Sequence, residues 1–111
     1  MEIKNRESND AEWFEAKSDG EIVGFAIASE QGRKKVKLDD IHVIPGMRKK
    51  GIGEKLLASI IHWAKSRGAS EIVGSFSPEF RGGKDEEAAR KFYGSQGFDI
   101  DADGNLYKKI D

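Results

Sequence analysis

The sequence predicts an α+β domain in which a mixed, mostly antiparallel sheet contains a central parallel βαβ crossover. Three observations support this fold class. Apolar and β-branched runs separated by glycine-containing turns occupy residues 12–43 and indicate an antiparallel meander. An amphipathic helical stretch over residues 52–67 then precedes another strand-like run at residues 71–76. Because a helix between two strands of one sheet favours a right-handed parallel crossover, we expect the strands that flank it to be parallel.

The first half of the chain is expected to form four strands. They lie at residues 1–5, 12–16, 21–29 and 35–43, and the first of them is expected at an edge of the sheet. Asp19-Gly20, between the second and third strands, is a strong hairpin-turn signal. The apolar alternation changes phase near Asp39 and Asp40, which predicts a β-bulge there. Strand alternation places these two carboxylates on opposite faces, with His42 on the face of Asp40.

Two helices and three strands are expected in the second half. An apolar stripe at helical spacing begins at Ile52 and ends before Gly68, a residue that suits the end of a helix. A second helix is expected at residues 85–96, with acidic residues in its first turn and Gly97 after its last. The remaining strands are expected at residues 71–76, 98–100 and 106–110.

The composition excludes several classes of protein. The 111 residues suffice for one domain, residues 1–111, and 19 basic against 20 acidic residues argue against a polycation that coats nucleic acid. The absence of cysteine excludes a thiolate nucleophile, and two histidines do not make a zinc site unaided, so no metal is expected. No apolar stretch is long enough to cross a membrane and the first residues do not resemble a signal peptide, so we expect a cytoplasmic protein without a membrane partner.

One turn carries residues suited to binding an anion. The segment Arg48-Lys49-Lys50-Gly51-Ile52-Gly53 stands between the fourth predicted strand and the first helix. Free N–H groups at a helix N-terminus, glycines and basic side chains together favour a phosphate or pyrophosphate. The alternative is an ordinary glycine-bearing turn with a solvated basic run. The pattern is neither a Walker motif nor a GxGxxG fingerprint, which argues against nucleoside triphosphates and dinucleotides.

Two segments carry a family resemblance. Residues 38–57 read LDDIHVIPGMRKKGIGEKLL and residues 88–98 read AARKFYGSQGF. The first resembles the central motif of the GCN5-related N-acetyltransferases (GNAT), and the second resembles the helix that precedes a Gly-Phe pair in the same family. Both stand in the order of the family, and the resemblance covers roughly residues 12–110. It implies the acyl-CoA N-acyltransferase fold.

The resemblance also implies an acetyl-CoA site. The backbone of Ile41, His42 and Val43 would hydrogen-bond the pantetheine arm. The amides of one continuous segment would hold the pyrophosphate, namely those of Arg48, Lys49, Lys50, Gly51, Ile52, Gly53 and Glu54. Glu86 stands where many members carry an asparagine that contacts the cofactor. Tyr93 matches the tyrosine that protonates the departing thiolate; a packed tyrosine of the helix stripe is the alternative.

A primary amine has a pKa of about 10.4 and is therefore protonated at neutral pH. It must lose a proton before it can attack an acyl group. Asp39 resembles an acidic position that serves as the base in the polyamine-acetylating branch of the family. Asp40 and His42 are the alternatives, since either could accept the proton directly or through water. Acidic side chains near the site favour a cationic acceptor, such as a small amine or a lysine of a protein or peptide.

The function implied is N-acetyl transfer from acetyl-CoA to an amine by direct attack in a ternary complex. Two alternatives are a non-catalytic acyl-CoA-binding module and a small nucleic-acid-binding or protein-binding domain; the net charge of −1 argues against nucleic acid. Most members of the family place two helices before the hairpin that matches residues 12–29. Here about ten polar residues precede it, so we expect an open acceptor face, for a bulky acceptor or for a homodimer that supplies the missing wall.

Overall fold

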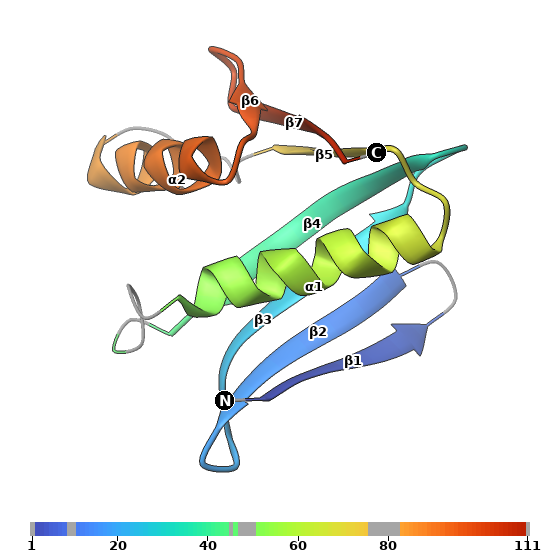
Figure 1. The fold of residues 1–111 in the computed structure, drawn as a ribbon. Helices are drawn as coiled ribbons and strands as arrows, with labels where there is room; N and C mark the ends of the chain where they lie inside the picture. Colours follow the sequence, from blue (N-terminus) through green and yellow to red (C-terminus); the bar gives the residue numbers. More distant parts are fainter. Residues whose placement is uncertain (1, 9–10, 45, 47–50, 76–82, 111) are drawn as a thin grey trace.

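One sheet of seven strands organises the part of the chain that the computed structural model describes, namely residues 2–8, 11–44, 46, 51–75 and 83–110. The elements are β1 (Glu2–Ser8), β2 (Ala11–Ser18), β3 (Glu21–Glu30), β4 (Lys35–Val43), α1 (Ile52–Ser66), β5 (Glu71–Ser75), α2 (Gly83–Ser95), β6 (Asp99–Ile100) and β7 (Asn105–Lys109). The strand order across the sheet is β1-β2-β3-β4-β5-β7-β6 (Figure 1). The predicted α+β class is confirmed, and β1 is the predicted edge strand.

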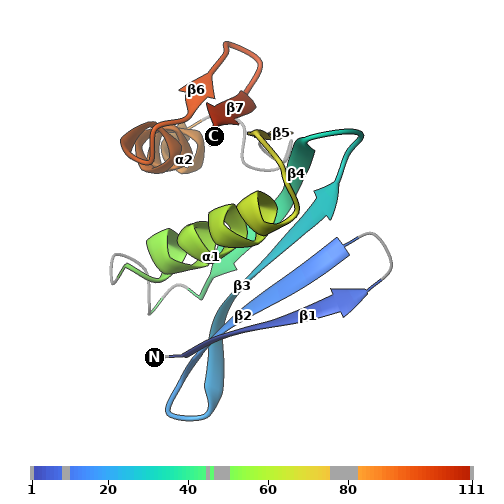
Figure 2. The same cartoon turned by 45° about the vertical axis from the view of Figure 1, so that its right-hand side comes forward.

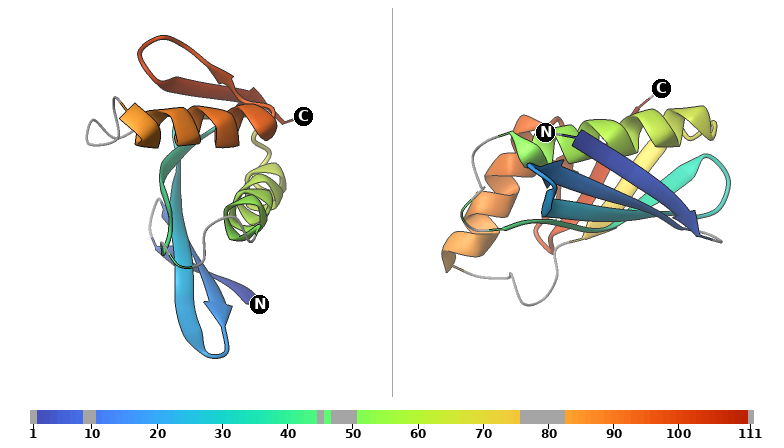
Figure 3. Two further views of the ribbon diagram at one scale, coloured as in Figure 1. Left: turned by 90° about the vertical axis from the view of Figure 1, so that its left-hand side faces the viewer. Right: turned by 90° about the horizontal axis from the view of Figure 1, so that it is seen from below.

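The parallel crossover lies where the sequence predicts it. β4 and β5 are parallel, whereas the other described strand pairs are antiparallel. Figures 1 and 2 agree that α1 runs along the sheet beside β3 and β4, while α2 lies beside β6 and β7, away from β1. Seen along the edge of the sheet (Figure 3, left), α1 covers one face of β2 and β3, and the described part of the chain places no helix on their other face.

The apolar stripe of α1 forms the centre of the core. Leu56, Leu57 and Ile60 are fully buried, and burial of one such side chain stabilises the fold by about 1.5–3 kcal/mol. Phe14 of β2 meets Trp63 of α1 edge to face, with ring centroids 6.0 Å apart. The helix ends as predicted, because Gly68 follows its last turn with φ 79°. The side of β2, β3 and β4 that packs against α1 is therefore the inner face of the sheet.

The predicted bulge is present and overturns the predicted faces of its two carboxylates. Ile27 pairs with Asp40 and Ala28 with Leu38, so Asp39 is the extra residue of β4. The Asp39 carboxylate accepts a hydrogen bond of 2.7 Å from the hydroxyl of Ser29, which shares the outer face with Ile27. Both carboxylates therefore lie on the outer face. The prediction of opposite faces was wrong because the inserted residue interrupts the alternation.

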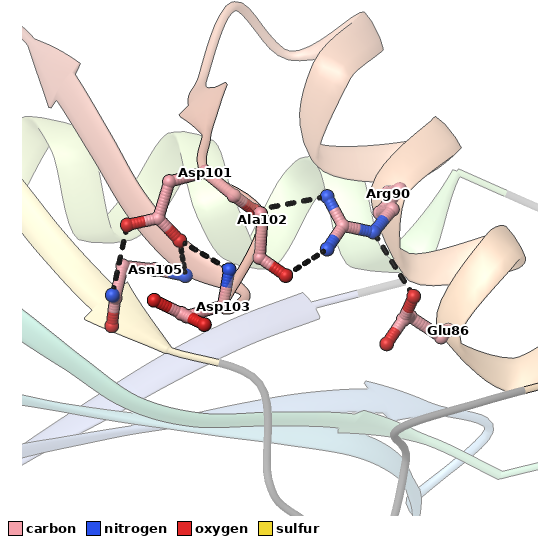
Figure 4. Close-up of polar contacts among 6 residues, drawn as sticks. All are labelled: Glu86, Arg90, Asp101, Ala102, Asp103 and Asn105. Carbon is pink, nitrogen blue, oxygen red and sulfur yellow. Dashed lines mark hydrogen bonds and ion pairs between the residues drawn. The ribbon is translucent and has the colours of Figure 1, made fainter.

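α2 is joined to the hairpin of β6 and β7 by one arginine (Figure 4). Nη1 and Nη2 of Arg90 donate to the carbonyls of Asp101 and Ala102 at 3.1 and 3.3 Å. Within the turn, the Asp101 carboxylate accepts hydrogen bonds from Asn105 and from the backbone N–H of Asp103. These bonds, above all those from Asn105, lower the pKa of Asp101. These contacts orient the helix that carries Tyr93. The helix begins at Gly83, earlier than predicted, and β5 ends at Ser75.

Two glycine-to-alanine substitutions are expected to change stability in opposite directions. A Cβ on Gly24 would lie 3.0 Å from the His42 carbonyl oxygen and 3.2 Å from Ile52 Cγ2, so we expect Gly24→Ala to lower the free energy of unfolding by about 1–3 kcal/mol. A Cβ on helical Gly94 would meet nothing within 4 Å, so we expect Gly94→Ala to raise it by about 0.5–1 kcal/mol. Urea unfolding of both variants measures this, and equal effects would contradict the packing described for β3.

Candidate functional site

β4 and β5 part halfway along β4. Their parallel pairing joins Lys35–Leu38 to Glu71–Gly74, and the described ladder ends there. β4 continues to Val43 along β3, and the bulge at Asp39 stands directly after the last parallel pair. Among the described residues, none pairs with β4 beyond Leu38 on the side of β5, and we call this stretch the open edge of β4. Backbone N–H and C=O groups on such an edge can bind an extended ligand as an added strand does. Ile41, His42 and Val43, the residues predicted to bind pantetheine, lie on this stretch.

The N-terminus of α1 has the properties of an anion site. Gly51 has φ 77°, a left-handed conformation that favours glycine, and no side chain caps the helix. The first helical bond runs from the N–H of Lys55 to the carbonyl of Gly51, at 3.1 Å. The N–H groups of the first turn, at Ile52, Gly53 and Glu54, therefore point along the helix axis with the positive end of its dipole. The predicted basic residues Arg48, Lys49 and Lys50 lie outside the described residues.

Gly53 allows the two helices to meet. A Cβ at this position would stand 3.2 Å from Cζ of Phe92, so the absence of a side chain permits the α2 ring to approach the first turn of α1. Phe92 is followed by Tyr93, whose ring it contacts edge to face at 5.1 Å. The close approach at Gly53 therefore brings the tyrosine helix to the N-terminal end of α1, although the two segments are far apart in the chain.

Tyr93 is held in a buried aromatic cluster. It is 8% exposed and packs edge to face against Phe98 as well, with centroids 5.5 Å apart. Burial and, second, the negative charge of Asp40 raise the pKa of the Tyr93 phenol well above its ordinary value. The hydroxyl is protonated at neutral pH, as that of an ordinary tyrosine is, so it can donate a proton but cannot act as a base. The carboxylate that acts on it is that of Asp40.

The three candidate bases differ in what they touch. Asp39 accepts the hydrogen bond from Ser29 and lies 3.9 Å from Lys37 Nζ, so its carboxylate is already engaged. Asp40 is exposed and has no hydrogen bond or ion pair with any residue in the described ranges. The His42 ring packs against Phe25 at 5.6 Å between centroids. Of the three candidates, Asp40 is therefore the one whose side chain remains available to a ligand.

Glu86 faces Arg90 rather than an open site. Its Oε2 accepts a hydrogen bond of 3.2 Å from Nε of Arg90, one turn later on α2 (Figure 4). The same arginine extends to the β6–β7 turn, so the Glu86 carboxylate belongs to a chain of contacts that fixes the hairpin. No local pattern in the sequence indicates this role, because the carbonyls of Asp101 and Ala102 meet Arg90 only in the folded chain.

A shallow groove of about 400 Å³ lies apart from these residues, between α1 and the strands β1 and β2, and is lined by Phe14, His62 and Trp63 among others. Nothing at this groove relates it to the opening of β4 and β5. Within the described ranges, no three His, Asp or Glu side chains gather as ligands for a metal ion. In the same part of the chain, no helix is long and apolar enough to cross a membrane.

Sequence comparison identifies related proteins. Residues 2–98 match the Acetyltransferase (GNAT) family. The aminoglycoside N(6')-acetyltransferase type 1 of Salmonella typhimurium is 32% identical over 74 residues, which are 60% of this chain and 51% of that protein. The streptothricin acetyltransferase of Streptomyces lavendulae is 38% identical over 56 residues, which are 50% of this chain and 30% of that protein. The chain therefore spans about half the length of the aminoglycoside acetyltransferase, and less of the other.

Structural comparison confirms the fold. A GNAT family acetyltransferase from Elizabethkingia anophelis, solved with acetyl-CoA bound, superposes with a TM-score of 0.76. The match covers 91% of this chain and 77% of that one at 18% sequence identity. At 18% identity, the structural similarity establishes the arrangement of helices and strands and does not by itself assign the site residues.

Alkaline titration is expected to show that Tyr93 ionises late. In a Tyr107→Phe background, tyrosinate absorbance should develop at a pH well above about 10, because burial and Asp40 both oppose the charged form. Adding Asp40→Asn removes the repelling charge and should lower the midpoint. Because only the unfolded state ionises this phenol readily just above about pH 10, the free energy of unfolding should fall as the pH rises above that value. Ionisation of Tyr93 at its ordinary pKa would contradict the described burial.

Proposed function

The chain belongs to the GNAT acetyltransferase family, and from this premise we propose that it transfers the acetyl group of acetyl-CoA to a primary amine, by direct attack in a ternary complex. The observation that carries the proposal is the convergence of three features at one end of the molecule. These are the open edge of β4, the uncapped N-terminus of α1 and the buried, protonated Tyr93. The chain has no cysteine to form an acyl-enzyme, which favours direct transfer.

The donor set fits acetyl-CoA. A pyrophosphate suits the N–H groups of the first turn of α1, because they carry partial positive charge and no side chain caps them. An extended arm with amide groups suits the β4 edge at Ile41, His42 and Val43, where the pairing with β5 has ended. Glu86 is engaged with Arg90, so we assign the binding of acetyl-CoA to backbone groups and leave Glu86 a positioning role.

The proposed transfer uses two side chains. Asp40 first accepts one proton from the bound ammonium, directly or through one water, and releases it to solvent. The neutral amine nitrogen then attacks the thioester carbonyl and loses its second proton to Asp40. The carbon–sulfur bond breaks, Tyr93 donates its phenolic proton to the departing thiolate, and the proton held by Asp40 returns to Tyr93 through solvent. The phenol is protonated before transfer, as a proton donor must be. We prefer Asp40 over the predicted Asp39 as the base, since Ser29 and Lys37 already engage Asp39.

The acceptor class that we propose is a cationic amine. Asp39 and Asp40 give the outer face of β4 two carboxylates, which attract an ammonium group. The similarity to an aminoglycoside acetyltransferase supports the same class, because aminoglycosides carry several amines.

Replacement of Tyr93 by phenylalanine tests the proposal. We expect Tyr93→Phe to lower kcat by about 10²–10⁴-fold, because the thiolate loses its proton donor, while the thermal shift produced by acetyl-CoA stays the same. Tyr107→Phe is the matched control and should retain full activity. Thiol release over a panel of amines, with calorimetric binding of acetyl-CoA, measures both effects.

Three outcomes have different meanings. An unchanged kcat in Tyr93→Phe would remove the acid role. Acetyl-CoA binding without transfer to any amine would identify a non-catalytic acyl-CoA-binding module. Absence of any shift with acetyl-CoA would refute the proposed function itself.

A further inference from the structure

The outer face of the sheet carries an aromatic row that the proposed transfer does not use. Trp13 of β2, Phe25 of β3 and His42 of β4 lie side by side across three neighbouring strands. Ring centroids are 5.8 Å apart for Trp13 and Phe25, and 5.6 Å apart for Phe25 and His42, with interplanar angles of 31° and 39°. We call these three residues the aromatic row.

The row lies on the face that α1 leaves open. Phe14, the neighbour of Trp13 in the chain, is buried against Trp63 of α1, so alternation turns Trp13 outward. Phe25 pairs directly with His42, and paired residues of antiparallel strands point to the same face. Trp13 is 38% exposed, and no helix covers this side of β2 and β3 in the described part of the chain (Figure 3, left).

The row ends next to Asp40, whose carboxylate has no hydrogen bond or ion pair with another described residue. Asp40 and His42 stand two residues apart on one strand and on the same face, which separates them by about 7 Å along β4. The charge of Asp40 also acts on the phenol of Tyr93. A ligand lying on the row therefore points one end toward Asp40 and toward the proposed site of transfer.

Cross-strand aromatic pairs by themselves stabilise a sheet, but two features point to a ligand. Trp13 exposes apolar surface to water instead of burying it, and the pairs Trp13–Ile27 and Ile27–Asp40 place it across the same face from the carboxylate, two strands away. Ring faces attract apolar ring surfaces and cations, and a neighbouring carboxylate selects an ammonium group. The charge complementarity fits one kind of small molecule, in which a ring with an apolar face carries a primary ammonium.

We propose that the aromatic row of Trp13, Phe25 and His42 is the acceptor platform, which holds the ring of a ring-bearing amine and presents its ammonium to Asp40. This inference rests on the proposed function and narrows its substrate class. An arylalkylamine carries a flat aromatic ring near an ammonium group, and an amino sugar carries a ring with an apolar C–H face near one, so both offer the required chemistry. Trp13 and Phe25 are then residues that determine specificity, and Asp40 binds every cationic acceptor.

Matched acceptors and matched variants test the platform. The probes are kanamycin and 2-phenylethylamine, which carry rings, and spermidine and n-butylamine, which do not. In the wild-type protein we expect kcat/KM to favour the ring-bearing probes. Trp13→Leu and Phe25→Leu should each lower the ratio of ring-bearing to acyclic kcat/KM by about tenfold, the change that about 1.4 kcal/mol of lost ring contact produces. Trp13→Phe should restore most of the ratio.

Tyr107→Leu is the control variant. Tyr107 is 39% exposed, nearly as much as Trp13, but lies on β7 and outside the row, so its replacement should leave the ratio unchanged. A ratio that is unchanged in both Trp13→Leu and Phe25→Leu would overturn the platform, as would an equal loss in Tyr107→Leu. A response to kanamycin alone or to 2-phenylethylamine alone identifies which of the two ring types the row accepts.

Equilibrium binding separates this inference from the proposed function. Calorimetry of kanamycin and 2-phenylethylamine should show binding that Trp13→Leu weakens and Tyr107→Leu does not, whether or not acetyl transfer is observed. If acetyl-CoA fails to bind while this pattern holds, the proposed function fails and the platform stands. If acetyl-CoA binds and transfer occurs with no preference for rings, the platform is overturned and the proposed function stands.

Discussion

The single extra residue at Asp39 is the constraint on which the rest of the site depends. It follows directly on the last described parallel pair between β4 and β5, so the side-chain alternation of β4 shifts by one residue just after that pair. Two consequences follow from one insertion. Ile41 and Val43 are kept on the inner face of the sheet, and both carboxylates of the bulge are turned to the outer face. A regular strand would have separated these carboxylates and kept one of them against the core.

Close packing connects this strand to the two helices. Gly24 admits Ile52 and Leu56 of α1 against β3, and Gly53 admits Phe92 of α2 against α1. A side chain at Gly24 would push α1 away from the sheet, and one at Gly53 would push α2 away from the N-terminal end of α1. The Arg90 contacts fix the far side of α2 on the β6–β7 turn (Figure 4). The raised pKa of Tyr93 is a product of burial, and this burial depends on the close approach of the helices.

The two faces of β4 divide the proposed chemistry. The inner face and the open edge belong with α1 and suit the acyl donor, while the outer face carries Asp40 and the aromatic row and suits the acceptor. Because β4 lies between these two regions, a donor carbonyl and an acceptor nitrogen can approach from opposite sides of one strand. This geometry suits direct attack and requires no residue to carry the acetyl group between them.

The order of helices and strands, the parallel crossover, the bulge and the candidate Tyr93 could all be predicted from the sequence, because each depends on residues close together in the chain. Alternation, helical spacing and turn glycines are local signals, and the two GNAT motifs are contiguous. Only the tertiary structure decided that Asp39 is engaged by Ser29 while Asp40 acts on Tyr93, that Glu86 faces Arg90, and that Trp13, Phe25 and His42 form one row. Those relations join residues on different strands and helices, whose register and approach are set by packing and are not encoded in any single segment.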